Sequence, residues 1–204
     1  MEDSVSPRWQ LPSADPSIAL RDYENHLQKL VVSRHRKMLE TLIEHVRTVL
    51  EGSLDGVMAT MVSEPEFSTW GPTGDVGPKG GDTVRAGYAG AFARPGGAIT
   101  NQVNKVERFV IDDNTIALEL TETRIWPAKL AKEQGYAVDG TDGYFAVRRR
   151  CAVIIPFDDQ ALIRGEMNYG FGWAVNPLDF ERVAEGDLSA EYAKWLAALE
   201  GDQQ

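Results

Sequence analysis

The chain has 204 residues, the size of one domain or of one domain with a terminal extension. Hydrophobic residues make up 43% of it, enough for a packed core and too many for a disordered protein. The formal net charge of -10 argues against a nucleic-acid partner, because phosphate binding needs a clustered positive surface. No apolar run approaches the roughly 20 residues of a membrane span.

The start of the chain and its cysteine bear on the compartment. Residues 1–16 are acidic, carry three prolines and show no periodicity, which predicts a flexible tail and no secretory signal. One cysteine, Cys151, excludes an intrachain disulfide and fits a reducing cytoplasm. Because Cys151 falls inside a predicted strand, we expect a buried, inert thiol. We therefore predict a cytoplasmic protein without a membrane partner.

Helical periodicity fills the next part of the chain. Apolar residues recur at spacings of three and four from residue 17 to residue 50, as one long helix or as two with a joint near Ser33. Gly52 is placed to end this stretch, and Ser53 to cap a shorter helix over 54–62. The glycine-rich run at 71–81 predicts a loop.

A further helix follows that loop, and the chain then changes to strand-like alternation. Asp82 or Thr83 is expected to cap the helix, which ends before residue 94. A terminal amphipathic helix is expected at about 188–199. Helices followed by an antiparallel meander indicate an α+β fold. The predicted strands are 103–111, 114–126, 144–156 and 161–171, with tight hairpin turns at 111–115 and 157–161 and a longer connection at 127–143.

One strand combines apolar and polar residues on the same face. Alternation places Glu122, Arg124 and Trp126 on the face that carries the apolar residues before them. An acid, a base and an indole on a buried face form a candidate pocket wall. The alternative is that these side chains reach solvent where the sheet ends.

Several short motifs in order resemble the nuclear transport factor 2-like superfamily, which includes ketosteroid isomerases, limonene epoxide hydrolases and SnoaL-like polyketide cyclases. They are GSLDGVM at 52–58, GDTVR at 81–85, DDNTIA at 112–117 and LIRGEMNY at 162–169. Each motif is short and degenerate, so the resemblance lies in their order, over roughly 34–175. It implies a curved antiparallel sheet wrapped around a long helix, forming a cone with an apolar pocket.

The resemblance divides the chain into four parts. Residues 34–180 form the cone domain, and residues 17–33 form a helical extension before it. The flexible tail occupies 1–16, and a C-terminal helix and tail occupy 181–204.

His45 is the first candidate for chemistry. It lies on or beside the buried stripe of the long helix, and by gapless counting it takes the place of the oxyanion-hole tyrosine of ketosteroid isomerases. A neutral imidazole there is able to donate a hydrogen bond or act as a base. The alternative is a core-edge histidine bonded to a carbonyl or to water. His26 and His35 are too far along the helix to join it around one ion, so we expect no metal site.

The resemblance also tests known mechanisms. Thr69 or Trp70 falls where isomerases carry their general-base aspartate, and Val153 falls where they carry a second oxyanion-hole acid, so the chain is not expected to be a ketosteroid isomerase. Epoxide hydrolases carry an Asp-Arg-Asp set. One aspartate of that set would fall at or next to Asn168. The arginine and the other aspartate would fall at Glu122 and Arg124, where the acid and the base stand in reversed order.

Two expectations conflict on the last strand. Alternation alone puts Ile163 and Met167 on the apolar face and Glu166 and Asn168 on the other. The resemblance turns Glu166 and Asn168 into the cone instead. The sequence leaves this open, because dimerisation would bury both faces.

We therefore predict a homodimeric protein that binds an apolar, steroid- or polyketide-like small molecule. His45 and Glu122 are the candidate catalytic residues of a cofactor-free isomerase, dehydratase or hydrolase. The alternative is a non-catalytic interaction protein that uses its sheet face for assembly. The candidate ligand-binding residues are Thr69, Trp70, Arg124, Trp126 and Asn168.

Overall fold

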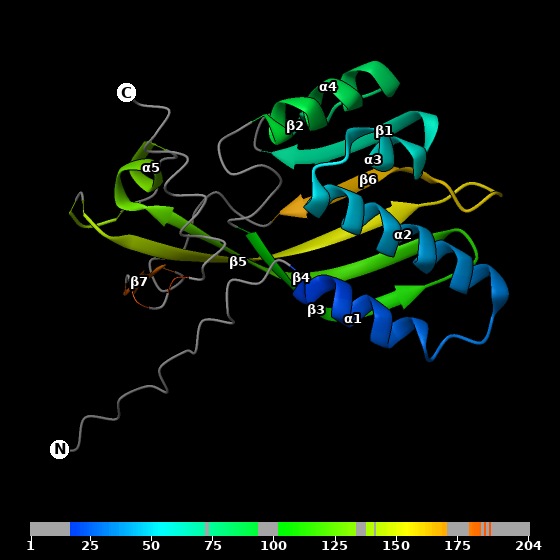
Figure 1. Cartoon of the computed structure of the whole chain (residues 1–204), viewed down its shortest axis with the longest axis horizontal. Coiled ribbons are helices and arrows are strands. Elements are labelled where there is room, and N and C mark those ends of the chain that lie inside the picture. Colours follow the sequence, from blue (N-terminus) through cyan, green and yellow to red (C-terminus); the bar gives the residue numbers. More distant parts are fainter. Residues whose placement is uncertain are drawn as a thin grey trace.

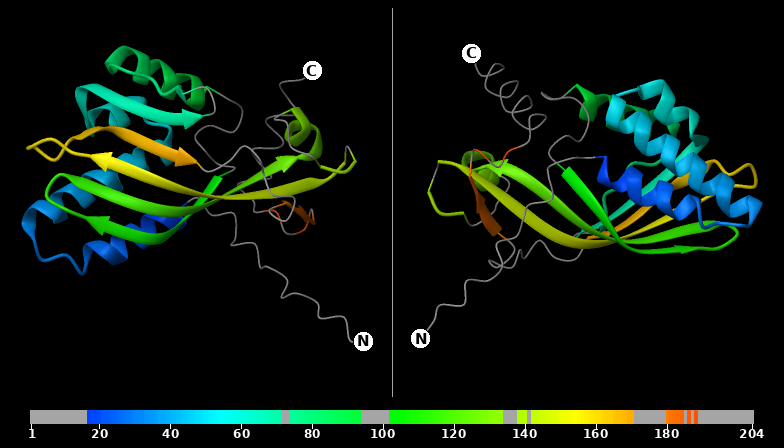
Figure 2. Two further views of the ribbon diagram at one scale, coloured as in Figure 1. Left: turned by 180° about the vertical axis from the view of Figure 1, so that it is seen from behind. Right: turned by 60° about the horizontal axis from the view of Figure 1, so that its bottom comes forward.

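A curved sheet with helices on its concave side forms the body of the protein (Figures 1 and 2). The computed structural model describes residues 17–71, 74–93, 102–133, 138–140, 142–170, 180–184, 186 and 188. The mixture of helices and one large sheet confirms the α+β class. The predicted tail at 1–16 and the predicted terminal helix at 188–199 lie outside the described residues, apart from residue 188 itself.

The long helical stretch is two helices and not one. The joint lies at residues 28–32, where Arg36 donates hydrogen bonds to the carbonyls of Leu27 and Leu30 at 2.9 and 3.1 Å. These bonds satisfy carbonyls at the end of the first helix. The helices are α1 (Ile18–Leu27), α2 (Ser33–Glu51), α3 (Leu54–Ala59), α4 (Gly81–Phe92) and α5 (Ala128–Glu133).

The helix ends follow the expected capping chemistry with one correction. Gly52 ends α2 in the left-handed conformation, and the Ser53 hydroxyl accepts a hydrogen bond from the Gly56 amide at 3.3 Å. The predicted cap of α4 by Asp82 or Thr83 is wrong, because α4 begins at Gly81. The Glu64 carboxylate accepts a hydrogen bond from the Gly81 amide at 3.2 Å, so the helix start is capped from the neighbouring strand.

Among the described residues, the sheet has seven strands, and their order along its main path is β2-β1-β6-β5-β4-β3, with β7 paired to β5. All described pairings are antiparallel except β1 with β6, which run parallel. The two predicted hairpins, β3–β4 and β5–β6, are present. The strands are β1 (Met61–Gly71), β2 (Gly74–Asp75), β3 (Gln102–Ile111), β4 (Thr115–Pro127), β5 (Tyr144–Pro156), β6 (Ile163–Gly170) and β7 (Phe180–Val183).

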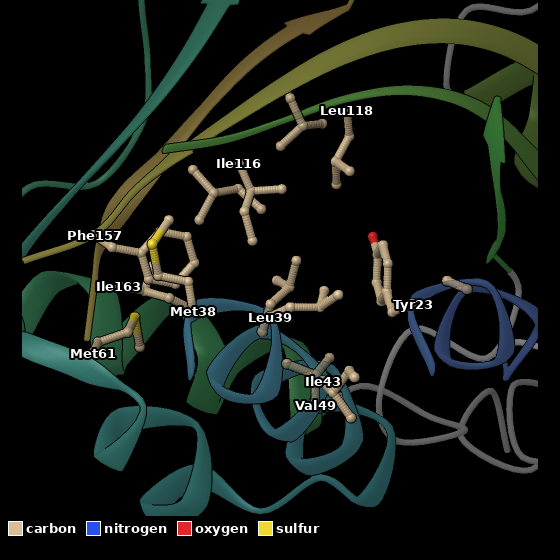
Figure 3. Close-up of a cluster of buried hydrophobic side chains, with 14 of the residues drawn as sticks. Tyr23, Met38, Leu39, Ile43, Val49, Met61, Ile116, Leu118, Phe157 and Ile163 are labelled. Carbon is tan, nitrogen blue, oxygen red and sulfur yellow. The ribbon is translucent and has the colours of Figure 1, made fainter. Parts of the chain in front are cut away.

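The main core lies between α2 and the concave face of the sheet (Figure 3). Met38 and Leu39 of α2 are fully buried against residues of β4 and β5, including Ile116. Helix α1, which the sequence assigns to an extension, contributes Ala19 and Tyr23 to the same core. The apolar stripe of α2 therefore has the partner that its periodicity requires.

An arginine fixes the start of α2 against the tips of both hairpins. The Arg34 guanidinium donates to the backbone carbonyls of Asp113 and Asp159 at 3.0 and 3.1 Å, and also to that of Asp158. This contact holds α2 in place along the sheet, and so fixes which of its residues face the concave surface.

Candidate functional site

A row of polar residues continues the apolar core along the concave face of β4 and β5. Glu122 follows Leu120 on this face and is only 3% exposed, so it does not reach solvent. Arg149 lies opposite Glu122 in the strand register and donates two hydrogen bonds to its carboxylate, each of 2.9 Å. The Nε atom of Arg124 lies 2.7 Å from the same carboxylate. A buried carboxylate held by two guanidinium groups is a fixed negative charge.

A change of phase in β6 resolves the conflict over Glu166 and Asn168. Ile163 belongs to the buried core, as alternation predicts. At Gly165, where φ is 150°, the strand departs from regular alternation. Beyond it, Glu166 pairs with Phe67 and Asn168 pairs with Val153 on the concave side. The expectation from alternation therefore holds before Gly165, and the expectation from the resemblance holds after it.

Glu166 is a second carboxyl on the concave side, and its pKa is raised. Burial raises the pKa of Glu166, the Coulomb repulsion of Glu122 raises it further, and a hydrogen bond from Asn168 lowers it. Its side chain is nevertheless only partly buried. A desolvated carboxyl that keeps some accessible surface on a concave face is placed to meet a ligand.

His45 is buried and engaged at both ring nitrogens. Its Nδ1 lies 2.8 Å from the Thr60 hydroxyl, and its Nε2 lies 3.1 Å from the Tyr88 hydroxyl. The Thr60 hydroxyl donates to the Val57 carbonyl at 2.6 Å, so it accepts from Nδ1–H. Nε2 then accepts from the Tyr88 O–H. Burial lowers the pKa of His45 to about 4, which keeps this imidazole neutral near pH 7.

The other predicted site residues lie in different places. Thr69 pairs with Asn168 and follows Phe67 on the concave side, but it is exposed. Trp126 is partly buried one step beyond Arg124 and contacts the small clusters at the far end of β4.

Trp70 lies outside this group. It is 50% exposed and stacks on Tyr169, with ring centroids 6.5 Å apart, on the outer face of the sheet. The predicted place of Trp70 in the cone lining is therefore corrected. Its neighbour Thr69 pairs with Asn168 on the concave side, and successive residues of a strand point to opposite faces.

The site residues predicted from the sequence leave out three members of the polar group, namely Arg149, Glu166 and Tyr88, although the resemblance turns Glu166 into the cone. Arg149 lies between Arg148 and Arg150, and only the strand register shows which of the three faces inward. For Glu166, a signal was present, because a glycine inside a strand pattern often marks a bulge. Cys151, in contrast, is buried as predicted, and burial raises the pKa of its thiol to about 11.

A surface cleft of about 430 Å³ lies at the hairpin tips, and none of the predicted site residues lines it. No cluster of three or more His, Cys, Asp or Glu residues able to hold a metal occurs among the described residues. Within that same part, no helix is long and apolar enough to cross a membrane.

No family model and no curated protein matches this chain. Three of the solved structures with a similar fold are the following. An NTF2-like protein of unknown function from Mesorhizobium loti has 11% identity over 70% of this chain and 98% of its own, with a TM-score of 0.48. The epoxide hydrolase/cyclase-like enzyme SalBIII, which takes part in pyran ring formation in salinomycin, has 12% identity over 72% of this chain and 97% of its own. The TM-score is 0.47. A Mycobacterium tuberculosis protein in complex with estradiol-17beta-hemisuccinate has 17% identity over 71% of this chain and 98% of its own. The TM-score is 0.44.

At this level of similarity, the ligands and reactions of those proteins carry no information about the ligand of this chain. The architecture rests on the elements and strand pairings of the chain itself.

Proposed function

We propose that the chain binds an apolar small molecule on the concave side of the sheet and exchanges a proton with it through Glu166. The observation that supports this is a partly accessible carboxyl on that face whose pKa burial raises. A general acid or base works best when its pKa lies close to the operating pH, and desolvation moves a carboxyl in that direction. The reaction would be a cofactor-free isomerisation, dehydration or hydrolysis in which one proton moves.

The neighbours of Glu166 have separate roles in this proposal. Asn168 would orient the Glu166 carboxyl, because its side chain hydrogen-bonds to it. Glu122, held by Arg149 and Arg124, would supply a fixed charge and would not act as the base predicted from sequence. These arginines would also orient a polar group of the ligand at the edge of the site.

His45 becomes a positioning residue in this proposal. Both of its ring nitrogens are occupied, so it has no lone pair left for a substrate. It instead fixes the hydroxyl of Tyr88, whose pKa burial raises. The Tyr88 oxygen would then present its acceptor lone pairs to the interior.

The lining favours an apolar, neutral ligand. Partly buried apolar side chains on this side of the protein, among them Phe67, Phe92 and Val106, would contact the ligand body. The carboxyl of Glu166, when ionised, would oppose an anionic group placed beside it by Coulomb repulsion. Steroid- and polyketide-like compounds fit this description, and a cytoplasmic location is part of the same proposal.

Substituting Glu166 by glutamine tests the proposed acid. The folded-state pKa of Glu166 lies above its ordinary value of about 4.5, so wild-type stability should fall as the pH rises from 4.5 through the raised pKa. Glu166→Gln removes this titration, and its stability relative to wild type should increase with pH. The measurement is urea unfolding at several pH values, together with fluorescence titration of the apolar probe 2-acetylnaphthalene.

A matched control lies on the other face of the sheet. Glu119 of β4 is bound by Arg108 and Arg150 there, so Glu119→Gln should leave probe affinity and its pH dependence unchanged. Probe binding whose pH dependence is the same in wild type and in Glu166→Gln would contradict the role of Glu166.

A second function is favoured by one observation on the outer face. Trp70, Met167 and Tyr169 are 50%, 36% and 36% exposed, and they lie on the paired strands β1 and β6. Exposed aromatic residues of this kind are typical of protein interfaces. We propose that this patch mediates assembly into a homodimer.

The assembly proposal predicts a change in oligomeric state. Trp70→Ser combined with Tyr169→Ser should weaken self-association by about tenfold or more, because buried aromatic residues carry much of the energy of an interface. Sedimentation velocity over a concentration series measures this. The control is Val110→Ser, which replaces an apolar residue on β3 that is 63% exposed. A wild-type chain that stays monomeric would rule the proposal out.

A further inference from the structure

Tyr23 is a buried side chain whose hydroxyl has no hydrogen-bond partner in the described part of the chain. The side chain is only 4% exposed, and no hydrogen bond to its hydroxyl is formed among the residues that the structure describes. Figure 3 shows the hydroxyl oxygen pointing from α1 toward the concave face of the sheet, where Leu118 lies. A hydroxyl that forms no hydrogen bond within the protein adds little to packing, so a phenylalanine would serve as well there for packing alone.

The orientation of Tyr23 is fixed by its neighbours on α1. The Asp22 carboxylate accepts a hydrogen bond of 3.2 Å from the Val106 amide, next to the register shift in β3. One turn later, the His26 ring stacks on Phe109 with centroids 4.6 Å apart. These two contacts hold α1 along β3 and turn Tyr23 into the interior.

The hydroxyl of Tyr23 and the carboxyl of Glu166 lie close enough to interact electrostatically. The negative charge of Glu166 contributes to the raised pKa of Tyr23, as do Asp22 and Cys151, after burial as the main cause. Glu166 comes from β6, while Tyr23 comes from a helix packed along β3, with β5 and β4 between those strands. The two polar groups therefore come from opposite ends of this run of four strands.

We propose that Tyr23 donates a hydrogen bond to the ligand, and that the ligand carries a neutral acceptor oxygen, such as a ketone, ether or ester oxygen, for this purpose. This deepens the proposed function and rests on it. A phenol that remains protonated is a donor suited to a neutral acceptor, and the nearby carboxyl groups oppose an anionic one. Helix α1 would then be one wall of the site, although it lies outside the region of family resemblance.

A pair of probes that differ only in the acceptor tests this assignment. We use 2-acetylnaphthalene, which has a carbonyl oxygen, and 2-ethylnaphthalene, which has none. Tyr23→Phe should weaken binding of the ketone by about five- to tenfold, the value of one buried hydrogen bond, and leave binding of the hydrocarbon unchanged. The carbonyl stretching band of the bound ketone should also move to higher frequency in Tyr23→Phe, because a hydrogen bond to the oxygen is lost.

Stability and a control variant separate this role from a structural one. Because the hydroxyl has no hydrogen-bond partner among the described residues, Tyr23→Phe should unfold at the same urea concentration as wild type or at a higher one. Tyr169→Phe, on the outer face, should affect neither probe. Equal affinities of wild type and Tyr23→Phe for the ketone, or an equal loss for both probes, would overturn the assignment of Tyr23 alone. Failure of both probes to bind the wild type would overturn the proposed function as well.

Discussion

Gly165→Ala is expected to lower the free energy of unfolding by roughly 3 kcal/mol or more, because the new methyl group has no room. A Cβ atom at this position would lie 1.8 Å from the backbone oxygen of Glu66, its partner on the parallel strand β1. The φ angle of 150° is also one that residues with a side chain rarely adopt. Both strain and overlap therefore act against the substitution. Urea unfolding monitored by tryptophan fluorescence measures the loss.

The same substitution should disturb the site. If β6 regularises to admit the methyl group, Glu166 and Asn168 turn away from the concave face. We expect the surviving folded protein to lose its affinity for 2-acetylnaphthalene. Gly90→Ala is the matched control, since a Cβ atom there meets nothing within 4 Å and the residue lies inside α4. That control should gain about 0.5–1 kcal/mol, and a loss in both variants would refute the explanation from Gly165.

Much of the fold could be predicted because its signals are local. The two hairpins follow from acidic turns between alternating strands: Asp112 and Asp158 each accept a backbone hydrogen bond from a residue two positions later, at 2.8 and 2.9 Å. The end of α2 and the start of α3 follow from Gly52 and Ser53 in the same way. In each case a few neighbouring residues determine the backbone conformation.

The polar site could be predicted only in part because it depends on register between distant segments. Glu122 and Arg124 lie on one face of one strand, so alternation brings them together. The pairing of Glu122 with Arg149 depends on the alignment of β4 with β5 across the longer connection. The position of Tyr23 depends on the packing of α1 against β3, for which the sequence around Tyr23 carries no local signal.

The parallel pairing of β1 with β6 was likewise out of reach of sequence reasoning. It joins residues about 100 positions apart, such as Phe67 and Glu166, and no turn connects them. The alternating pattern of a strand does not distinguish a parallel from an antiparallel neighbour.

His45 should make the protein sensitive to acid. Its pKa is lowered from 6.5 to about 4 by burial, so the unfolded chain binds a proton at a higher pH than the folded protein does. Stability should therefore fall as the pH drops from about 7 and level off near pH 4. Each pKa unit corresponds to about 1.4 kcal/mol, so the imidazole accounts for a loss on the order of 3 kcal/mol.

His45→Gln removes this titration and should flatten the pH dependence of the free energy of unfolding between about pH 7 and pH 4. The variant also loses the contacts with Thr60 and Tyr88, which lowers its stability at neutral pH. Glu166 acts in the opposite direction, because its raised pKa favours the folded state as the pH falls. Glu166→Gln should therefore be more sensitive to acid than wild type, and the combined variant should fall between the two single variants. Urea unfolding at half-unit steps from pH 4 to pH 7.5 measures all four slopes, and an unchanged slope in His45→Gln would mean that the buried imidazole is not the group that responds to acid.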